Sequence, residues 1–238
     1  MFGWVAGALL ASLGVQDMPT PAATPAAQPA GSPAMAAAKA NRARMKTGPK
    51  FKSGPAAEIP ASALTKGEHG EVRISAIIGS DGRLAEAEIT LSSRSPTLDA
   101  LALEIAAQTL FEPARDAEGN PLAIGAVLPV QFSNLYSPGQ GGGVLRYRCD
   151  QFARDQDWWK TNWPEKGDQF YNMSVGMLVM SNPNGIAATT GKALDGFKKR
   201  WTEAIEACRK EPEKLAIDQL GPIGEAMRRL ATKAPGSL

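Results

Sequence analysis

Histidine and cysteine are scarce in this sequence. One histidine, His69, and two cysteines, Cys149 and Cys208, are present among 238 residues. A zinc site made of several histidines, or of Cys-x-x-Cys pairs, needs more of these ligands than the chain has. The inventory excludes both kinds of metal site, and we predict no bound metal or other cofactor.

A strong excess of one charge is missing as well. Lys and Arg number 26 and Asp and Glu number 24, so the net charge is +2. A balance this close to neutral gives no sign of a nucleic-acid partner. The glycines at 139–143 lack the following Lys and Ser or Thr of a phosphate-binding loop. We therefore predict neither nucleic acid nor nucleotide as a ligand.

Catalytic groupings are also lacking. His69, Ser93 and Asp99 have the residue types of a hydrolytic triad, but no pattern in the sequence brings them together. Asp99 suits the first turn of a helix, and Ser93 the end of a strand. Glu86 and Glu88 alternate along one strand, which is typical of a solvated face. We predict that the protein is not an enzyme.

The apolar run at residues 2–15 is too short for a membrane helix, which needs about 20 residues. It fits the hydrophobic region of a signal peptide, although the basic residues that usually precede that region are missing. We interpret residues 1–16 as a signal peptide or as the end of a truncated anchor. The first case predicts an exported periplasmic protein, and the second an inner-membrane-anchored one.

Residues 17–57 are rich in Pro and Ala, which favours an extended, solvated linker. The linker is basic, because Lys and Arg recur between Lys39 and Lys52 and the next acidic residue is Glu58. A solubilising tether is the favoured interpretation. The alternative is a segment that binds an anionic surface of the cell envelope.

Residues 70–93 alternate between apolar and polar residues and contain the turn sequence Gly79-Ser80-Asp81-Gly82. This pattern predicts a β-hairpin with one buried and one solvated face. The residues predicted to face inward are Val72, Ile74, Ala76, Ile78, Ala85, Ala87, Ile89 and Leu91.

A helix is predicted next, because Ser95 suits an N-cap and Pro96 the first helical position. A third strand follows and completes the order β-β-α-β, with this strand beside the first and parallel to the second. Pro129 cannot donate to a strand ladder, so we predict an edge strand that can bind an extended peptide. The residues of this candidate site are Ile124, Gly125, Ala126, Val127, Leu128, Pro129, Val130, Gln131 and Phe132.

The same region, at about residues 58–134, resembles the C-terminal domain of the TonB family. The residues that carry the resemblance are Ile59-Pro60, Gly67, Gly70, Val72, Asp81-Gly82-Arg83, Ser92-Ser93, Leu98-Asp99, Phe111-Glu112-Pro113-Ala114, Gly119-x-Pro121 and Val127-x-Pro129-Val130-x-Phe132. Two features differ from the family: Ile59 replaces the usual tyrosine, and residues 1–16 are shorter than the family's membrane anchor and contain no histidine.

The resemblance implies a periplasmic protein whose last strand pairs with a peptide of an outer-membrane TonB-dependent receptor. It also implies a proline-rich tether through which inner-membrane motor proteins supply the energy for transport. We place this domain at residues 58–136.

Beyond a Gly-rich linker at 137–143, apolar residues recur at helical spacing. Residues 144–238 are therefore predicted to form an all-α domain, and the chain as a whole an α+β protein. Cys149 and Cys208 each lie on the apolar stripe of a helix, so export predicts a disulfide between them, whereas a reducing compartment predicts two buried thiols.

Many aromatic residues also lie in this region, from Phe152 to Trp201. Helical spacing favours core packing for them, and a ligand or client surface is the alternative. The placement of the cysteines resembles that of the HdeA-like family of small periplasmic helical proteins. That resemblance implies the alternative function, a structural or chaperone-like protein whose helical domain binds partners.

Overall fold

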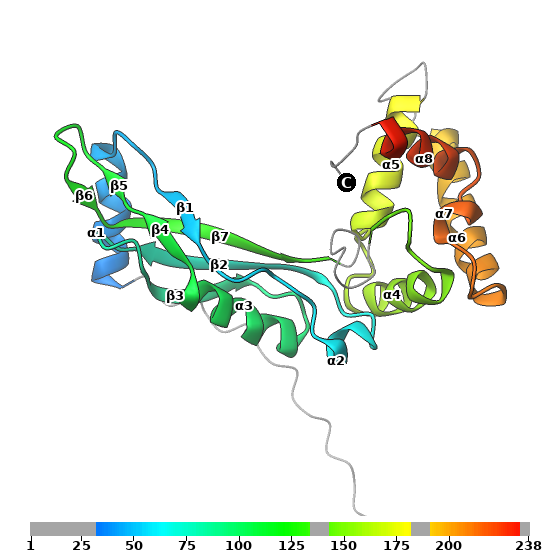
Figure 1. The fold of residues 1–238 in the computed structure, drawn as a ribbon, viewed down its shortest axis with the longest axis horizontal. Helices are drawn as coiled ribbons and strands as arrows, with labels where there is room; N and C mark the ends of the chain where they lie inside the picture. Colours follow the sequence, from blue (N-terminus) through cyan, green and yellow to red (C-terminus); the bar gives the residue numbers. More distant parts are fainter. Residues whose placement is uncertain (1–31, 134–142, 182–190, 234–238) are drawn as a thin grey trace, which may run out of the picture. The chain divides into compact units, whose positions relative to one another are not determined.

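The computed structural model describes residues 32–133, 143–181 and 191–233 (Figure 1). The predicted signal peptide or anchor at 1–16 lies outside these residues, as does nearly all of the predicted linker at 137–143. Strands and one long helix fill the first described range, and helices fill the other two. The α+β class predicted from the sequence is confirmed.

The sheet has three strands in the order β3-β2-β7. The central strand β2 (Gly70–Ile78) is antiparallel to β3 (Leu84–Leu91) and to β7 (Ile124–Phe132). The pairing of β2 with β7 is continuous, from Gly70 opposite Phe132 to Ile78 opposite Ile124 (Figure 1). The last strand therefore lies beside the first and parallel to the second, as predicted.

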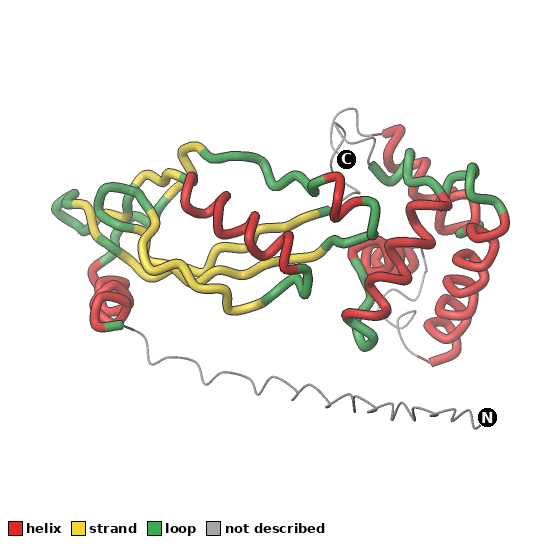
Figure 2. Tube along the Cα trace, turned by 90° about the horizontal axis from the view of Figure 1, so that it is seen from below, coloured by secondary structure: helices red, strands yellow, loops and turns green. Residues whose placement is uncertain are grey.

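Helix α3 (Pro96–Gln108) covers one face of the sheet (Figure 2). Ser95 caps it by accepting a hydrogen bond of 3.2 Å from the backbone N–H of Leu98, and Pro96 occupies the first turn. Leu98 and Ala102 are fully buried against β2, so this helix and this sheet face form the core of the domain. The helix ends at Gln108, and Leu110 begins the short strand β4 (Leu110–Glu112).

The alternation predicted for β3 is wrong at several positions. Ala85 and Ala87 are exposed, although they were predicted to face inward. The pairing with β2 shifts register twice, and Glu86 has a φ of 50°. Each extra residue in a bulge reverses which face the following side chains occupy. Ile89 consequently lies opposite Ile74 as expected, whereas Leu91 lies opposite Arg73.

Part of the predicted linker is folded. Residues 33–53 contain α1 (Pro33–Ala40), the short helix η1 (Asn41–Arg44) and β1 (Lys50–Ser53), so the extended backbone predicted here is wrong. Met35 and Ala38 of α1 pack on Ile77, on the sheet face opposite α3. Strand β1 pairs with β4. The remaining elements of this part are α2 (Ala61–Leu64), β5 (Ala114–Arg115) and β6 (Pro121–Leu122).

The second part of the chain is all-α, as predicted. Its helices are α4 (Cys149–Asn162), α5 (Gln169–Ser181), α6 (Gly191–Lys210), α7 (Ala216–Gln219) and α8 (Pro222–Lys233). Phe152, Phe170 and Phe197 are 0% exposed, and Trp201 packs edge-to-face on Phe152. These aromatic residues therefore belong to the core, and the interpretation of all of them as a client surface is wrong.

The predicted disulfide joins Cys149, at the start of α4, to Cys208, near the end of α6. It closes a loop with a sequence separation of 59 residues, for which the chain-entropy estimate is about 4 kcal/mol. Among the described residues, none of the helices is both long enough and apolar enough to span a bilayer.

The hairpin turn rests on a close backbone approach at Gly82. This residue has a φ of +79°, and its carbonyl accepts a 2.9 Å hydrogen bond from the backbone N–H of Phe111. A Cβ at this position would lie 1.9 Å from the Phe111 carbonyl oxygen. At Gly119, φ is +86° but a Cβ would meet nothing within 4 Å.

We expect Gly82→Ala to lower the free energy of unfolding by about 3 kcal/mol, because strain and a backbone clash add. Gly119→Ala supplies the control, with strain alone and a loss of about 1 kcal/mol. Urea denaturation of both variants measures the difference. Equal losses of unfolding free energy in the two variants would show that the close approach of Gly82 to Phe111 adds no cost beyond backbone strain.

Candidate functional site

Strand β7 has one paired edge and one open edge. It pairs with β2 along its full length, and no other strand within the described residues pairs with it. An open edge offers unpaired backbone N–H and C=O groups to an incoming extended chain. The nine residues predicted from the sequence as the candidate site all lie in this one strand.

Pro129 shows which backbone groups face the open edge. It lies opposite Arg73 in an uninterrupted ladder, although proline has no N–H to donate. In an antiparallel pair, both groups of one residue point to the same side, and the next residue points to the other. The Arg73 carbonyl fits this orientation, because it accepts a 3.2 Å hydrogen bond from Thr90 Oγ1 of β3, on the far side from β7.

The backbone groups of Gly125, Val127, Pro129 and Gln131 therefore point away from β2. Val127 is 60% exposed, and Pro129 and Gln131 are also exposed. The alternate residues point to β2, and two of them, Val130 and Phe132, are buried in the core under α3. The even-numbered residues of β7 therefore pair with β2 and contribute to the core, whereas the odd-numbered residues keep their backbone groups accessible.

Helix α1 and η1 limit the open edge at its beginning. A Cβ on Gly125 would lie 3.2 Å from both Met35 Sδ and Lys39 Cγ. Asn41 Nδ2 donates a 2.9 Å hydrogen bond to the carbonyl of Ala123. The accessible stretch therefore runs from residue 126 to residue 131.

Helix α1 was not predicted from the sequence, although its start carries the same signal as that of α3. Ser32 is followed by Pro33, just as Ser95 is followed by Pro96. The Ser32 side chain accepts a 3.0 Å hydrogen bond from the backbone N–H of Met35. This cap predicts a helix, and the surrounding Pro and Ala obscured it.

Of the three residues considered as a catalytic triad, Ser93 and Asp99 are in contact, whereas His69 is not. Ser93 Oγ donates to Asp99 Oδ1 at 2.7 Å, and the backbone N–H of Ser93 donates to the same oxygen at 2.9 Å. His69 instead stacks on Trp159, with 4.8 Å between ring centroids. Asp99 thus fastens the loop before α3 at the first turn of that helix, and no triad forms.

Two buried titratable groups have shifted pKa values of opposite sense. Burial lowers the pKa of His69 to about 4, although a hydrogen bond to the backbone of Asp155 opposes this shift. Burial raises the pKa of Asp168 to about 6, although hydrogen bonds from Tyr171 and Gln156 oppose it. Both side chains are almost fully enclosed, with exposed fractions of 8% and 2%.

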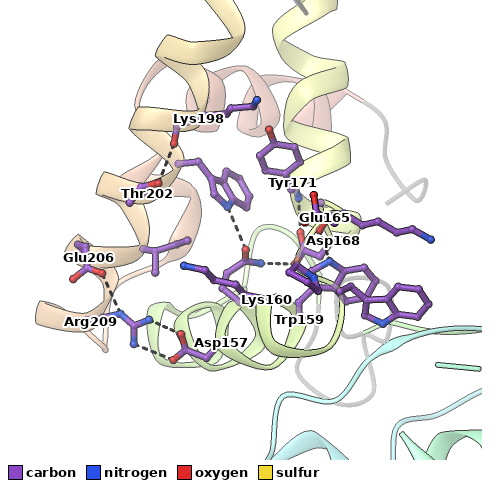
Figure 3. A pocket seen from close by; sticks show the side chains of 17 residues that line it. Asp157, Trp159, Lys160, Glu165, Asp168, Tyr171, Lys198, Thr202, Glu206 and Arg209 are labelled. Atoms are coloured by element: carbon purple, nitrogen blue, oxygen red, sulfur yellow. Dashed lines mark hydrogen bonds and ion pairs between the residues drawn. The ribbon is translucent and has the colours of Figure 1, made fainter. Parts of the chain in front are cut away.

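The helical part contains a cleft of about 510 Å³ (Figure 3). Residues of α4, α6 and the start of α5 line it, together with residues of the loop between α4 and α5. Trp201 Nε1 donates to Gln156 Oε1 at 3.2 Å, and Gln156 Nε2 in turn donates to Asp168. The cleft therefore has a fixed polar base among aromatic walls.

The basic segment 39–52 is held against the first domain by backbone hydrogen bonds. The N–H of Lys46 donates to the Arg115 carbonyl at 2.8 Å, and the N–H of Arg115 donates to the Thr47 carbonyl at 2.9 Å. Lys50 and Lys52 are exposed, and between them Phe51 is 65% exposed. The segment thus presents cations and an aromatic ring to solvent from a fixed backbone.

Groups of three or more His, Cys, Asp or Glu side chains that could hold a metal ion are absent from the described residues. The family model for the Gram-negative bacterial TonB protein C-terminal region matches residues 55–133. This range agrees with the resemblance identified from the sequence. Among curated proteins, none matches the chain.

His69 and Asp168 predict opposing effects of pH on stability. As pH falls from 6.5 to about 4, the unfolded chain protonates His69 first, so this residue removes about 3 kcal/mol of stability. As pH falls from about 6 to 3.8, the folded chain protonates Asp168 first, which adds about 3 kcal/mol.

We therefore expect the wild type to change little in stability between pH 6.5 and pH 4. His69→Gln should gain stability over this range as pH falls, and Asp168→Asn should lose it. Urea denaturation at several pH values measures both trends. Parallel pH profiles for the three proteins would contradict the assignment.

Proposed function

We propose, from the premise that residues 55–133 form a TonB C-terminal domain, that this protein binds an extended peptide in the periplasm by strand addition to β7. The peptide belongs to an outer-membrane transporter of the TonB-dependent class. The observation that carries the proposal is Pro129 within a fully paired strand, because it directs one row of backbone groups outward.

The open row gives the incoming strand an uneven set of partners. Val127 and Gln131 each present an N–H and a C=O, whereas Pro129 presents only a C=O. A strand added here gains a net stabilisation of about 1 kcal/mol from each backbone hydrogen bond. The exposed Val127 side chain adds apolar contact on the face opposite α3. A small number of backbone hydrogen bonds over residues 126–131 suits a peptide complex that forms and dissociates repeatedly.

We include in this proposal that the protein couples inner-membrane energy to transport across the outer membrane. A protein-interaction domain of this family acts at the cell envelope, and force reaches it through the chain that precedes it. In this protein α1, η1 and β1 pack on the sheet and on β4. A pull from inner-membrane motor proteins would reach the sheet through these contacts before it reaches Ile59.

Two prolines at neighbouring positions test the strand-addition site. Val127→Pro removes an outward N–H, so we expect the fold to persist and peptide binding to fall at least tenfold. Leu128→Pro removes an N–H directed at β2, so we expect the domain to unfold. Circular dichroism reports the fold, and calorimetry reports binding of peptides from the periplasm-facing ends of outer-membrane transporters.

Pro129→Val completes the series, because it restores a donor and should strengthen binding. Unchanged binding by Val127→Pro would remove β7 as the site. If Leu128→Pro folds and Val127→Pro does not, the N–H of Val127 points toward β2 and that of Leu128 away from it, opposite to our assignment.

We also propose that the basic segment 39–52 binds an anionic envelope surface, with lipid headgroups as its ligand. The exposed Phe51 between two lysines supports a lipid surface, because an aromatic ring can enter the headgroup layer that the lysines attract. Each lysine near such a surface contributes about 1 kcal/mol.

Lys50→Gln/Lys52→Gln should therefore weaken binding to vesicles of phosphatidylglycerol and phosphatidylethanolamine about thirtyfold. Lys192→Gln/Lys210→Gln on α6 makes the same charge change elsewhere and should leave binding unaltered. Co-sedimentation measures both. Equal losses in the two variants would indicate a general charge effect and would exclude the segment as the binding surface.

A further inference from the structure

The beginning of β7 is enclosed, whereas the rest of its open edge is accessible. Gly125 and Val127 both direct their backbone groups away from β2. Val127 is 60% exposed, whereas Gly125 is buried. Because glycine has no side chain, the buried atoms are those of the backbone. A neighbouring segment therefore keeps the N–H and C=O of Gly125 away from solvent.

That segment is α1 together with η1, which lie beside the beginning of β7 (Figure 1). Met35 Sδ and Lys39 Cγ lie 3.2 Å from the position that a Cβ on Gly125 would take, so α1 is in direct contact with this residue. Asn41 Nδ2 occupies the carbonyl oxygen of Ala123 at 2.9 Å. A strand that adds to β7 cannot reach these backbone groups while α1 and η1 are in place.

The attachment of α1 to the sheet is small. Its two buried residues, Met35 and Ala38, pack with Ile77 in a cluster that is separate from the core under α3. At the start of the helix, the hydroxyl of Ser32 donates a hydrogen bond to Glu86 of β3. A segment with so few buried contacts opens locally more readily than the core of its domain.

Helix α1 does not replace the hydrogen bonds that the edge lacks. Within the part of the chain that the structure describes, Gly125 forms no hydrogen bond with α1 or η1. A buried backbone N–H or C=O without a partner costs free energy, and an added strand would recover it. The covered residues therefore keep the capacity to pair with a strand once the helix is displaced.

A released α1 would not persist as a helix. It has eight residues, and isolated helices shorter than about 12 residues are marginal in water. The docked helix and the released chain are therefore two distinct states of this segment. The chain enters α1 at Ser32, so tension on the residues before it acts on α1 before it acts on the sheet.

We propose that α1 and η1 form a detachable cover, whose release extends the peptide-binding site from residues 126–131 to residues 123–131. The inference rests on the proposed strand addition to β7 and adds the regulation of that site.

The extension matters because the uncovered stretch has few donors. Pro129 has no N–H, so Val127 and Gln131 supply the outward N–H groups of this stretch. Release of the cover adds the N–H and C=O of Gly125 and the C=O of Ala123. Each backbone hydrogen bond raises the affinity about fivefold, so two more predict a gain of at least tenfold.

Hydrogen exchange of the wild type tests the cover directly. The probes are a six-residue peptide from the periplasm-facing end of an outer-membrane transporter and two nine-residue versions, lengthened by three threonines at one end or the other. We expect one longer peptide to lower the protection of the α1 amides, because a ligand that binds only the uncovered edge shifts the population toward it. The six-residue peptide should leave this protection unchanged.

A variant that releases the cover tests the gain in affinity. Met35→Asp places a charge among the apolar side chains that hold α1. We expect the longer peptide to bind this variant at least tenfold more tightly than the six-residue peptide in isothermal titration calorimetry. In the wild type the two affinities should differ by less than threefold, because displacement of α1 offsets the added bonds. Met180→Asp, at a methionine of α5 that is 71% exposed, is the matched control and should behave as the wild type.

Loss of α1 protection in Met35→Asp without a gain for the longer peptide would overturn the inference. Full protection of α1 in this variant and in every complex would overturn it as well, and binding of the six-residue peptide would then leave the proposed function of β7 standing. If no peptide binds any of the three proteins, β7 is not the site and both proposals fail. Circular dichroism reports the fold of the variants, and if Met35→Asp unfolds, hydrogen exchange of the wild type decides.

Discussion

The orientation of backbone groups along β7 is the constraint on which the rest of the first domain depends. One residue, Pro129, cannot donate a hydrogen bond, yet the ladder with β2 runs past it without a break. The alternate residues must therefore carry the pairing, and their side chains are those that pack under α3. A single local property of proline thus fixes both what the strand buries and what it leaves open.

The segment before this domain acts on the same strand. Helix α1 rests on Ile77, and Asn41 binds the carbonyl of Ala123 just before β7 begins. These contacts shorten the open edge at one end and attach the preceding chain to the sheet that contains the candidate site. A segment composed mostly of Pro, Ala and basic residues can therefore be both a connection and a part of the folded domain.

The helical part follows a different principle, because its stability and its cleft come from the same aromatic residues. Phe152, Phe170 and Phe197 fill the core, and a disulfide joins α4 to α6. Trp201 is shared, since it packs on this core and also lines the cleft. The packing of α4 against α6 therefore holds Trp201 both in the core and at the wall of the cleft.

Features that depend on neighbouring residues could be predicted from the sequence: the hairpin turn, the cap of α3, the edge character of the strand with Pro129, and the helical stripes that carry the cysteines. Contacts in the tertiary structure decided instead the exposure of Ala85 and Ala87, the folding of residues 33–53, and the hydrogen bond from Asn41 to Ala123 that limits the open edge of β7. The physical reason is that alternation, capping and proline chemistry act within a few residues, whereas bulges, docking and clefts depend on contacts between segments far apart in the chain.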